Sequence, residues 1–247
     1  MHLKRKLDHW AGRLQQNTAI KAGQWHAWVK YGKALRLSGK LAAADVAFER
    51  AVQEYQGNSP FDLAEIFYER SLGWLAGPEP DHRQARRYLE FAVSYLPGYV
   101  DAHLQLARVY LHLHYKGSAR TLLEAIKDGP DPRAAAMLAG LYEKAGDDPL
   151  AKASLNAAKD KYEKVLETVP YVASDHAVDF FLELGEDPAR ALELAEMNLR
   201  VRPTLVAFEK AIAAAKQAAD TTALCRIVDE LQNRFPNAKL VGMVACS

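Results

Sequence analysis

The stretch 27–51, AWVKYGKALRLSGKLAAADVAFERA, contains a complete supersecondary unit. Its first half places bulky residues on both sides of Gly32 along one helical face. Gly39 then interrupts the helix. In the second half, Ala44 and Phe48 are four residues apart and begin the apolar stripe of a second helix, with a small residue where a neighbouring helix must approach closely. The stretch therefore predicts a helical hairpin.

The second-helix pattern recurs along the chain. A small or apolar residue opens it and a bulky or apolar residue follows four positions later, at intervals of 32 to 41 residues. The opening residues are Ala44, Ala85, Ala119, Ala151, Ala191 and, more weakly, Leu224. In three units a proline, Pro97, Pro203 or Pro236, is placed to end the second helix. The sequence thus predicts six hairpins.

The first unit resembles the tetratricopeptide repeat, a hairpin of 34 residues with the pattern Trp-x2-Leu-Gly-x2-Tyr followed by Ala-x3-Phe. Trp28 and Gly32 match the first half of this pattern, although the apolar Leu35 replaces its tyrosine. Ala44 and Phe48 match the second half. The resemblance implies an all-α fold, an α-α superhelix or solenoid of about six stacked hairpins.

The repeat resemblance covers residues 25–236 and defines the expected domain organisation. Residues 1–24 carry apolar residues at helical spacing, and we expect a helix that caps the first hairpin, with a partner-binding helix as the alternative. Residues 237–247 are expected to form a short C-terminal cap or a tail.

Two of the intervals are longer than the others, and each predicts an insertion. In the second unit, Gly77, Pro78 and Pro80 cannot continue a helix and therefore predict an enlarged, protruding turn. In the fourth unit, apolar residues continue at helical spacing up to Pro170, which predicts a second helix about two turns longer than standard. The end of that helix, at residues 162–166, is expected to overhang its neighbours.

The family resemblance also implies that the first helices line a concave groove that holds a peptide segment of a partner protein. The groove positions are those that the hairpin core does not use: His26, Val29, Lys33, Arg36, Leu104, Arg108, Leu111, His112, Arg133, Ala136, Lys144, His176 and Phe180. This basic and apolar set suggests a partner with acidic residues or a terminal carboxylate and apolar anchors, because arginine binds carboxylates through two hydrogen bonds. The alternative is a set of solvated helix faces, since acidic residues such as Glu65 and Glu69 lie among them.

Catalytic and metal-binding patterns are missing from the sequence. It contains no Gly-rich phosphate loop, Gly-x-Ser-x-Gly elbow or HExxH helix, so we expect neither an enzyme nor a cofactor. His112 and His114 are two residues apart, whereas a metal-binding pair on a helix needs a spacing of three or four. Aromatic residues gather around the second unit, where core packing is expected and a peptide-binding aromatic shelf is the alternative. They are Tyr68, Trp74, Tyr88, Phe91, Tyr95 and Tyr99.

Charge and cysteine content limit the partners and the compartment. Lysine and arginine total 32 against 31 acidic residues, so no overall field attracts the chain to nucleic acid or to a membrane surface. No stretch approaches 18 uninterrupted apolar residues, and no membrane span is expected. Cys225 and Cys246 are too few for a disulfide framework, and we expect Cys225 to be a buried, inert thiol in a reducing compartment. The charged start predicts a cytoplasmic protein, and a periplasmic one would require a removed leader.

These observations favour a non-enzymatic scaffold or adaptor that binds a peptide segment of another protein in its groove. The alternative is a structural assembly component that associates with itself or joins a multiprotein complex through its outer helices and its ends. The overhanging helix at 162–166 and the apolar tail at 240–244 motivate that alternative.

Overall fold

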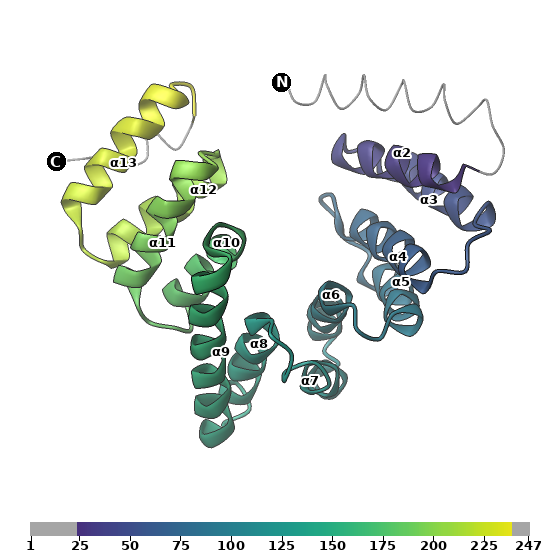
Figure 1. The fold of residues 1–247 in the computed structure, drawn as a ribbon, viewed down its shortest axis with the longest axis horizontal. Coiled ribbons are helices and arrows are strands. Elements are labelled where there is room, and N and C mark those ends of the chain that lie inside the picture. The colour runs from purple at the N-terminus through teal and green to yellow at the C-terminus, as the bar shows by residue number, and fades with distance from the viewer. Residues whose placement is uncertain (1–23, 239–247) are drawn as a thin grey trace. The chain divides into compact units, whose positions relative to one another are not determined.

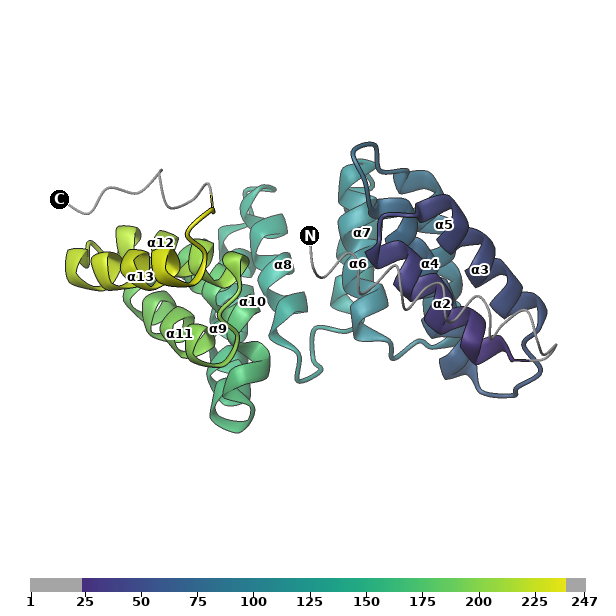
Figure 2. The ribbon, with the colours of Figure 1, turned by 90° about the horizontal axis from the view of Figure 1, so that it is seen from above.

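The computed structural model describes residues 24–238 of the chain, apart from the side chains of residues 172–174. The described residues form twelve helices and contain no strand. They divide after Ile126 into two compact units. Within each unit, consecutive helices pair into hairpins, and the hairpins stack on one another (Figures 1 and 2). The predicted all-α solenoid of six hairpins is confirmed.

The first unit contains the first three hairpins. Its helices are α2 (Trp25–Leu37), α3 (Leu41–Gln53), α4 (Pro60–Leu75), α5 (His82–Tyr95), α6 (Val100–His112) and α7 (Lys116–Glu124). Helix α3 packs against α4, and α5 packs against α6, so that each hairpin rests on the next. The two first helices α2 and α4 also contact one another directly.

The second unit contains the other three hairpins. Its helices are α8 (Pro132–Glu143), α9 (Asp148–Thr168), α10 (Pro170–Leu182), α11 (Pro188–Val201), α12 (Leu205–Gln217) and α13 (Thr221–Arg234). One continuous hydrophobic cluster joins all six helices, and the first helices α10 and α12 contact one another.

The first hairpin follows the sequence pattern closely. Gly39 lies in the turn with φ +79°, a conformation that L side chains rarely adopt. Ala44 and Phe48 on α3 are both 0% exposed. Across from them, a Cβ atom on Gly32 would lie 2.8 Å from Phe48 Cε1. The small residue of α2 is therefore required by the aromatic ring of α3, because there is no space for a side chain between them.

The turn of the second hairpin is enlarged, as its glycine and prolines predict. Helix α4 continues to Leu75, and residues 76–81 then lead to α5. The loop returns onto its own hairpin, since the backbone N–H of Asp81 donates to the carbonyl of Trp74 over 2.9 Å. Gly77, at φ +95°, passes so close to α3 that an added Cβ would lie 3.2 Å from Leu41 Cδ1. These contacts hold the loop against both helices.

Helix α9 has 21 residues, so the predicted elongation is confirmed, but the predicted overhang is wrong. Tyr162 and Leu166 are 3% and 5% exposed, and the ring of Tyr162 stacks on Phe180 of α10 with centroids 4.6 Å apart. The start of the helix is open instead, and Leu150 is 46% exposed. The extra turns therefore pack against the next hairpin. The small buried residue of this helix is Ala158, which is fully buried, whereas Ala151, expected in that role, is half-buried.

Several smaller expectations have clear outcomes. Helices α5, α11 and α13 each end two residues before a proline, as predicted.

Cys225 is disulfide-bonded in the structure, so the expected free thiol is wrong. A structural disulfide is typical of oxidising compartments, and the cysteine argument for a reducing compartment no longer holds. The expected N-terminal cap, the tail and Cys246 lie outside the described residues.

Candidate functional site

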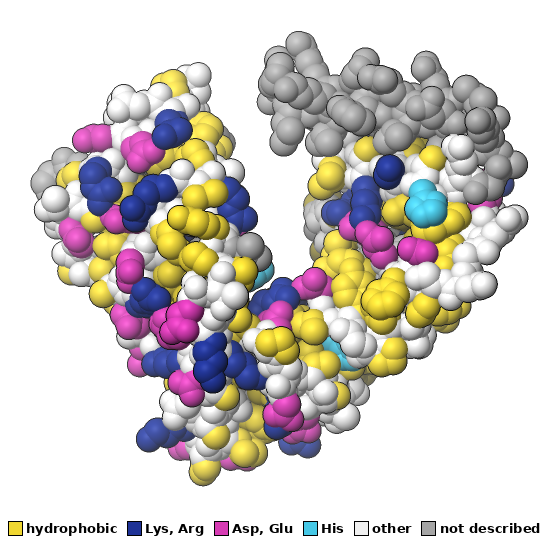
Figure 3. Space-filling view, viewed as in Figure 1, with side chains coloured by type: hydrophobic (Ala, Val, Ile, Leu, Met, Phe, Trp, Pro, Cys, Tyr) yellow, Lys and Arg dark blue, Asp and Glu magenta, His cyan; other side chains and the backbone are white. Residues whose placement is uncertain are grey.

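The first helices α2 and α4 carry a cluster of four charged side chains. Lys33 Nζ lies 2.6 Å from Glu65 Oε1 and 3.3 Å from Glu69 Oε1, and Arg36 Nη2 lies 2.8 Å from Glu69 Oε2. In Figure 3, basic and acidic side chains adjoin one another over these two helices. The direct contact between α2 and α4 positions all four groups. We call these residues the α2–α4 charge cluster.

The pairing within the α2–α4 charge cluster reduces its affinity for an external anion. Burial by itself would lower the pKa of Lys33, but the hydrogen bonds and negative charges of Glu65 and Glu69 raise it overall. The ammonium group therefore stays charged and is already neutralised by its own neighbours. An acidic ligand would have to compete with these two carboxylates, each of which is held in place by the fold.

Helix α6 presents a different pair of residues. Arg108 is exposed and makes a hydrogen bond of 3.2 Å to Gln105 on the same helix. His112, also exposed, lies against His82 of α5 with ring centroids 4.4 Å apart. On α2, the exposed His26 stacks on the ring of Trp25. Arg108 is thus more accessible to a carboxylate than Lys33 or Arg36, because among the described residues no acidic side chain pairs with its guanidinium.

In the second unit, Arg133 and His176 both interact with Asp131 at the start of α8, whereas Lys144 lies at the other end of that helix. Arg133 forms an ion pair with Asp131, the residue that caps α8, with Nη2 and Oδ2 2.5 Å apart. Lys144 is exposed at the C-terminal end of α8. His176 is exposed on α10, and its charge helps to lower the pKa of Asp131.

Several of the residues expected on the groove surface are buried. Val29, Leu104, Ala136 and Phe180 are 7%, 0%, 8% and 5% exposed. The expectation that they contact a partner is therefore corrected: they belong to the core. A first helix in a stack is flanked by helices of the same and of adjacent hairpins, so positions that look free in one isolated hairpin are covered by the next.

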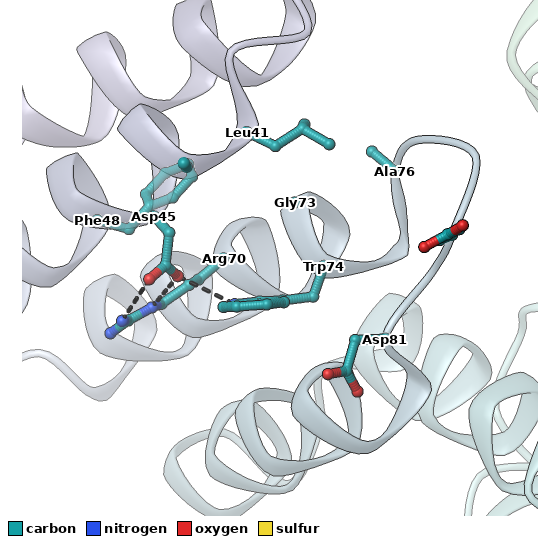
Figure 4. A pocket seen from close by; sticks show the side chains of 10 residues that line it. Leu41, Asp45, Phe48, Arg70, Gly73, Trp74, Ala76 and Asp81 are labelled. Carbon is teal, nitrogen blue, oxygen red and sulfur yellow. Dashed lines mark hydrogen bonds and ion pairs between the residues drawn. The ribbon is translucent and has the colours of Figure 1, made fainter.

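A pocket in the first unit was not predicted as a site. It encloses about 360 Å³ between α3, the end of α4 and the loop 76–81 (Figure 4). Its lining residues are Leu41, Ala42, Asp45, Phe48, Arg70, Gly73, Trp74, Ala76, Glu79 and Asp81. The signal in the sequence was the Gly-Pro-rich insertion, which indicates a longer turn but not the way in which the turn folds back.

Hydrogen bonds fix one side of this pocket. The Asp45 carboxylate accepts bonds from Arg70 Nε at 2.6 Å, from Arg70 Nη2 at 2.9 Å and from Trp74 Nε1 at 3.0 Å. The guanidinium of Arg70 also lies over the ring of Tyr88, 4.4 Å from its centroid. Burial alone would lower the pKa of Arg70, but the bonds and charge of Asp45 raise it. The indole of Trp74 is therefore held in a fixed orientation.

Comparison with known proteins agrees with this geometry. Residues 79–139 match the family model described as tetratricopeptide repeat. This part of the chain therefore carries a tetratricopeptide repeat. No curated protein matches its sequence.

Several solved structures are similar to this chain in fold. The crystal structure of MamA has a TM-score of 0.57 and 20% identity, covering 67% of this chain and 94% of that chain. A tetratricopeptide repeat protein from Parabacteroides merdae has a TM-score of 0.55 and 14% identity, covering 97% and 91%. The Cut9–Hcn1 structure has the same TM-score and 14% identity, covering 97% and 45%. At these identities the likeness concerns the fold alone.

The tetratricopeptide repeat is a protein-interaction scaffold and in general is not catalytic. Within residues 24–238, no group of three or more His, Cys, Asp or Glu side chains could hold a metal ion. None of the helices in that range is both long enough and apolar enough to cross a membrane.

Proposed function

We propose that this protein is an adaptor whose first helices bind a peptide segment of a partner protein. The observation that carries the proposal is the arrangement of α2, α4 and α6. Their packing positions are buried, while His26, Arg108 and His112 stay exposed on the remaining faces. A preformed helical surface binds a flexible segment with little reorganisation of its own. Arg108 supports a preference for a carboxylate in the bound segment.

The charge cluster changes where an acidic group would bind. Lys33 and Arg36 are already paired with Glu65 and Glu69, so they contribute less to binding than their positive charges suggest. We therefore place the acidic group of the partner at Arg108 rather than at Lys33 or Arg36. His112 in the first unit remains a candidate contact for the bound segment. Lys144 and His176 are exposed candidates of the second unit.

A selection from a random peptide library on the immobilised full chain provides a ligand for the test. The affinity of the strongest peptide is then measured by fluorescence anisotropy for wild type and for Arg108→Glu. Arg120→Glu on α7 is the matched control. The Arg120 side chain is 57% exposed and pairs with Glu124, one turn further along the same helix. We expect Arg108→Glu to weaken binding about tenfold, as expected for a charge-assisted hydrogen bond of roughly 1.4 kcal/mol. Equal affinities of the two variants would count against peptide binding on the exposed faces of α2, α4 and α6.

A second candidate function rests on a different surface. The outer helix α5 presents Phe91 and Tyr95, which are 46% and 42% exposed. Their ring centroids lie 5.1 Å and 5.6 Å from that of Phe67 on α4. Exposed adjoining aromatic residues favour association between proteins. This supports a structural component that associates with itself through its outer helices. Light scattering decides: a dimer that becomes a monomer in Phe91→Ser/Tyr95→Ser supports this candidate, and a wild-type monomer at high concentration excludes it.

A further inference from the structure

The pocket beside the loop 76–81 has the features of a preformed binding site. Loop residue Gly77 approaches Leu41 of α3, and the Asp81 N–H bonds back to Trp74 of α4. Two prolines, Pro78 and Pro80, restrict the backbone between these contacts. These contacts and the two prolines restrict the conformations of the loop, so that a ligand would have little of it to order on binding. A volume of about 360 Å³ lies within the range of small ligand sites.

A glycine in the pocket wall leaves space that a side chain would otherwise occupy. Gly73 lies within α4, where glycine costs about 1 kcal/mol relative to alanine. A Cβ atom built on Gly73 would meet no atom within 4 Å. The situation is the opposite of that at Gly32, where Phe48 requires the glycine. At Gly73 no packing contact requires it, and its effect is to keep the pocket open.

The pocket is apolar in its interior. Leu41, Phe48 and Ala76 contribute side chains from α3 and from the loop, and Trp74 adds its indole ring. In Figure 4 the indole lies below Leu41 and Ala76 and is seen edge-on. Because Asp45 holds Trp74 Nε1, the polar atom of the ring is already bonded. The interior therefore favours a large apolar side chain.

The charged residues of the pocket are unbalanced. Asp45, Glu79 and Asp81 contribute three carboxylates, and Arg70 is the single cation among the lining residues. Arg70 is paired with Asp45, and Asp81 caps α5 through Oδ1, which accepts bonds from the backbone N–H groups of Arg83 and Gln84. Neither Asp81 nor Glu79 on the exposed loop has a balancing cation among the lining residues. The exposed Glu49 also contacts Arg70, over 3.3 Å. The rim is thus negative and complements a basic ligand.

We propose that this pocket binds a peptide segment of a partner protein by inserting one large apolar side chain flanked by lysine or arginine. The apolar side chain occupies the space beside Gly73, on the ring of Trp74. The flanking cations lie at Glu79 and Asp81. This pocket includes the end of α4 but contains none of His26, Arg108 and His112, and it prefers the opposite charge, so it stands or falls independently of the function proposed above.

The indole N–H signals of the full chain provide a direct test. The chain contains four tryptophans, so a ¹⁵N-labelled sample gives few indole signals, and Trp74→Phe assigns the relevant one. The probe is acetyl-Gly-Lys-Leu-Lys-Gly-amide, compared with versions in which Ala replaces Leu or Glu replaces both lysines. We expect the first peptide to shift the Trp74 signal saturably at millimolar concentration. The other two should bind about tenfold more weakly, given the area of a leucine side chain and the sign of the rim charge.

Two variants separate binding in the pocket from binding elsewhere. Gly73→Leu fills the pocket and should abolish the shift, whereas Gly117→Leu on α7, where an added Cβ also meets no atom within 4 Å, should bind like wild type. Glu79→Gln should weaken the lysine-containing peptide about threefold while leaving the folded chain intact. The proposal is overturned if Gly73→Leu binds normally, if the acidic peptide binds as well as the basic one, or if no peptide shifts the signal. A Trp74 signal that moves with protein concentration alone would assign the pocket to a second copy of the chain and also overturn it.

Discussion

Two glycines on first helices show how the same residue type has different roles. An added Cβ on Gly32 would lie 2.8 Å from Phe48, whereas one on Gly73 would meet nothing within 4 Å. Sequence alone identified Gly32 from its place in the repeat pattern. It gave no reason to single out Gly73, because the open space around it depends on how the loop 76–81 folds back.

Alanine at these two glycines should change stability in opposite directions. Gly32→Ala should lower the free energy of unfolding by about 1 to 3 kcal/mol, because the new methyl group forces Phe48 to move. Gly73→Ala should raise it by about 0.5 to 1 kcal/mol, because alanine favours the helix and has space. Urea unfolding followed by circular dichroism measures both changes. Two variants that shift in the same direction would contradict the described packing.

At the scale of the element, the sequence predicted that α9 is long but not what its extra length does. Apolar spacing revealed the additional turns, since Tyr162 and Leu166 continue the stripe. Which neighbour covers that stripe depends on α10 and α11, which follow later in the chain. For the same reason Val29, Leu104 and Phe180 looked available for a partner and are buried. Periodicity finds the apolar face of a helix, whereas contacts between hairpins decide which faces remain open.

The packed end of α9 can be tested by comparing its two halves. Tyr162→Ala should lower the free energy of unfolding by about 3 to 5 kcal/mol, as expected for removing a buried aromatic ring. Leu150→Ala, at the open start of the helix, should change it by less than about 0.5 kcal/mol. Thermal denaturation of wild type and both variants measures these changes in the free energy of unfolding. Equal effects would mean that the far end of α9 is not packed against the next hairpin.

The cap of α8 predicts a pH dependence. Burial alone would raise the pKa of Asp131, but the hydrogen bonds and charge of Arg133 lower it below the usual range. Since the folded pKa is depressed, the stabilisation is present above the unfolded value of about 3.9 and is lost as the pH falls through the folded one. Asp131→Asn should therefore lower the free energy of unfolding by about 1 kcal/mol near neutral pH and by less in acid.

Urea titrations of Asp131→Asn near neutral pH and below about pH 3 measure this dependence. Asp128→Asn is the control, because that carboxylate is 89% exposed and pairs with the adjacent Lys127. A loss of stability in Asp131→Asn that does not diminish in acid would show that Asp131 stabilises the helix without its charge.

At the scale of the whole molecule, the number and order of the hairpins could be predicted because each hairpin repeats one local pattern. The division into two units after Ile126 could not, since no composition change marks it. Each unit has hydrophobic clusters of its own. We therefore expect the fragments 1–126 and 127–247 each to be helical and to unfold cooperatively when produced separately. A fragment without helical circular dichroism would show that the two units fold only together.

The proposed function requires that the exposed faces of the first helices bind a partner's peptide segment. Backbone amide signals of the ¹⁵N-labelled chain, followed while the selected peptide is added, test this claim most directly. We expect the largest shifts on exposed residues of α2, α4 and α6, around Arg108, and we expect Arg108→Glu to remove them. Shifts confined to the outer helices α3, α5 and α7, or an unchanged response in Arg108→Glu, would contradict it.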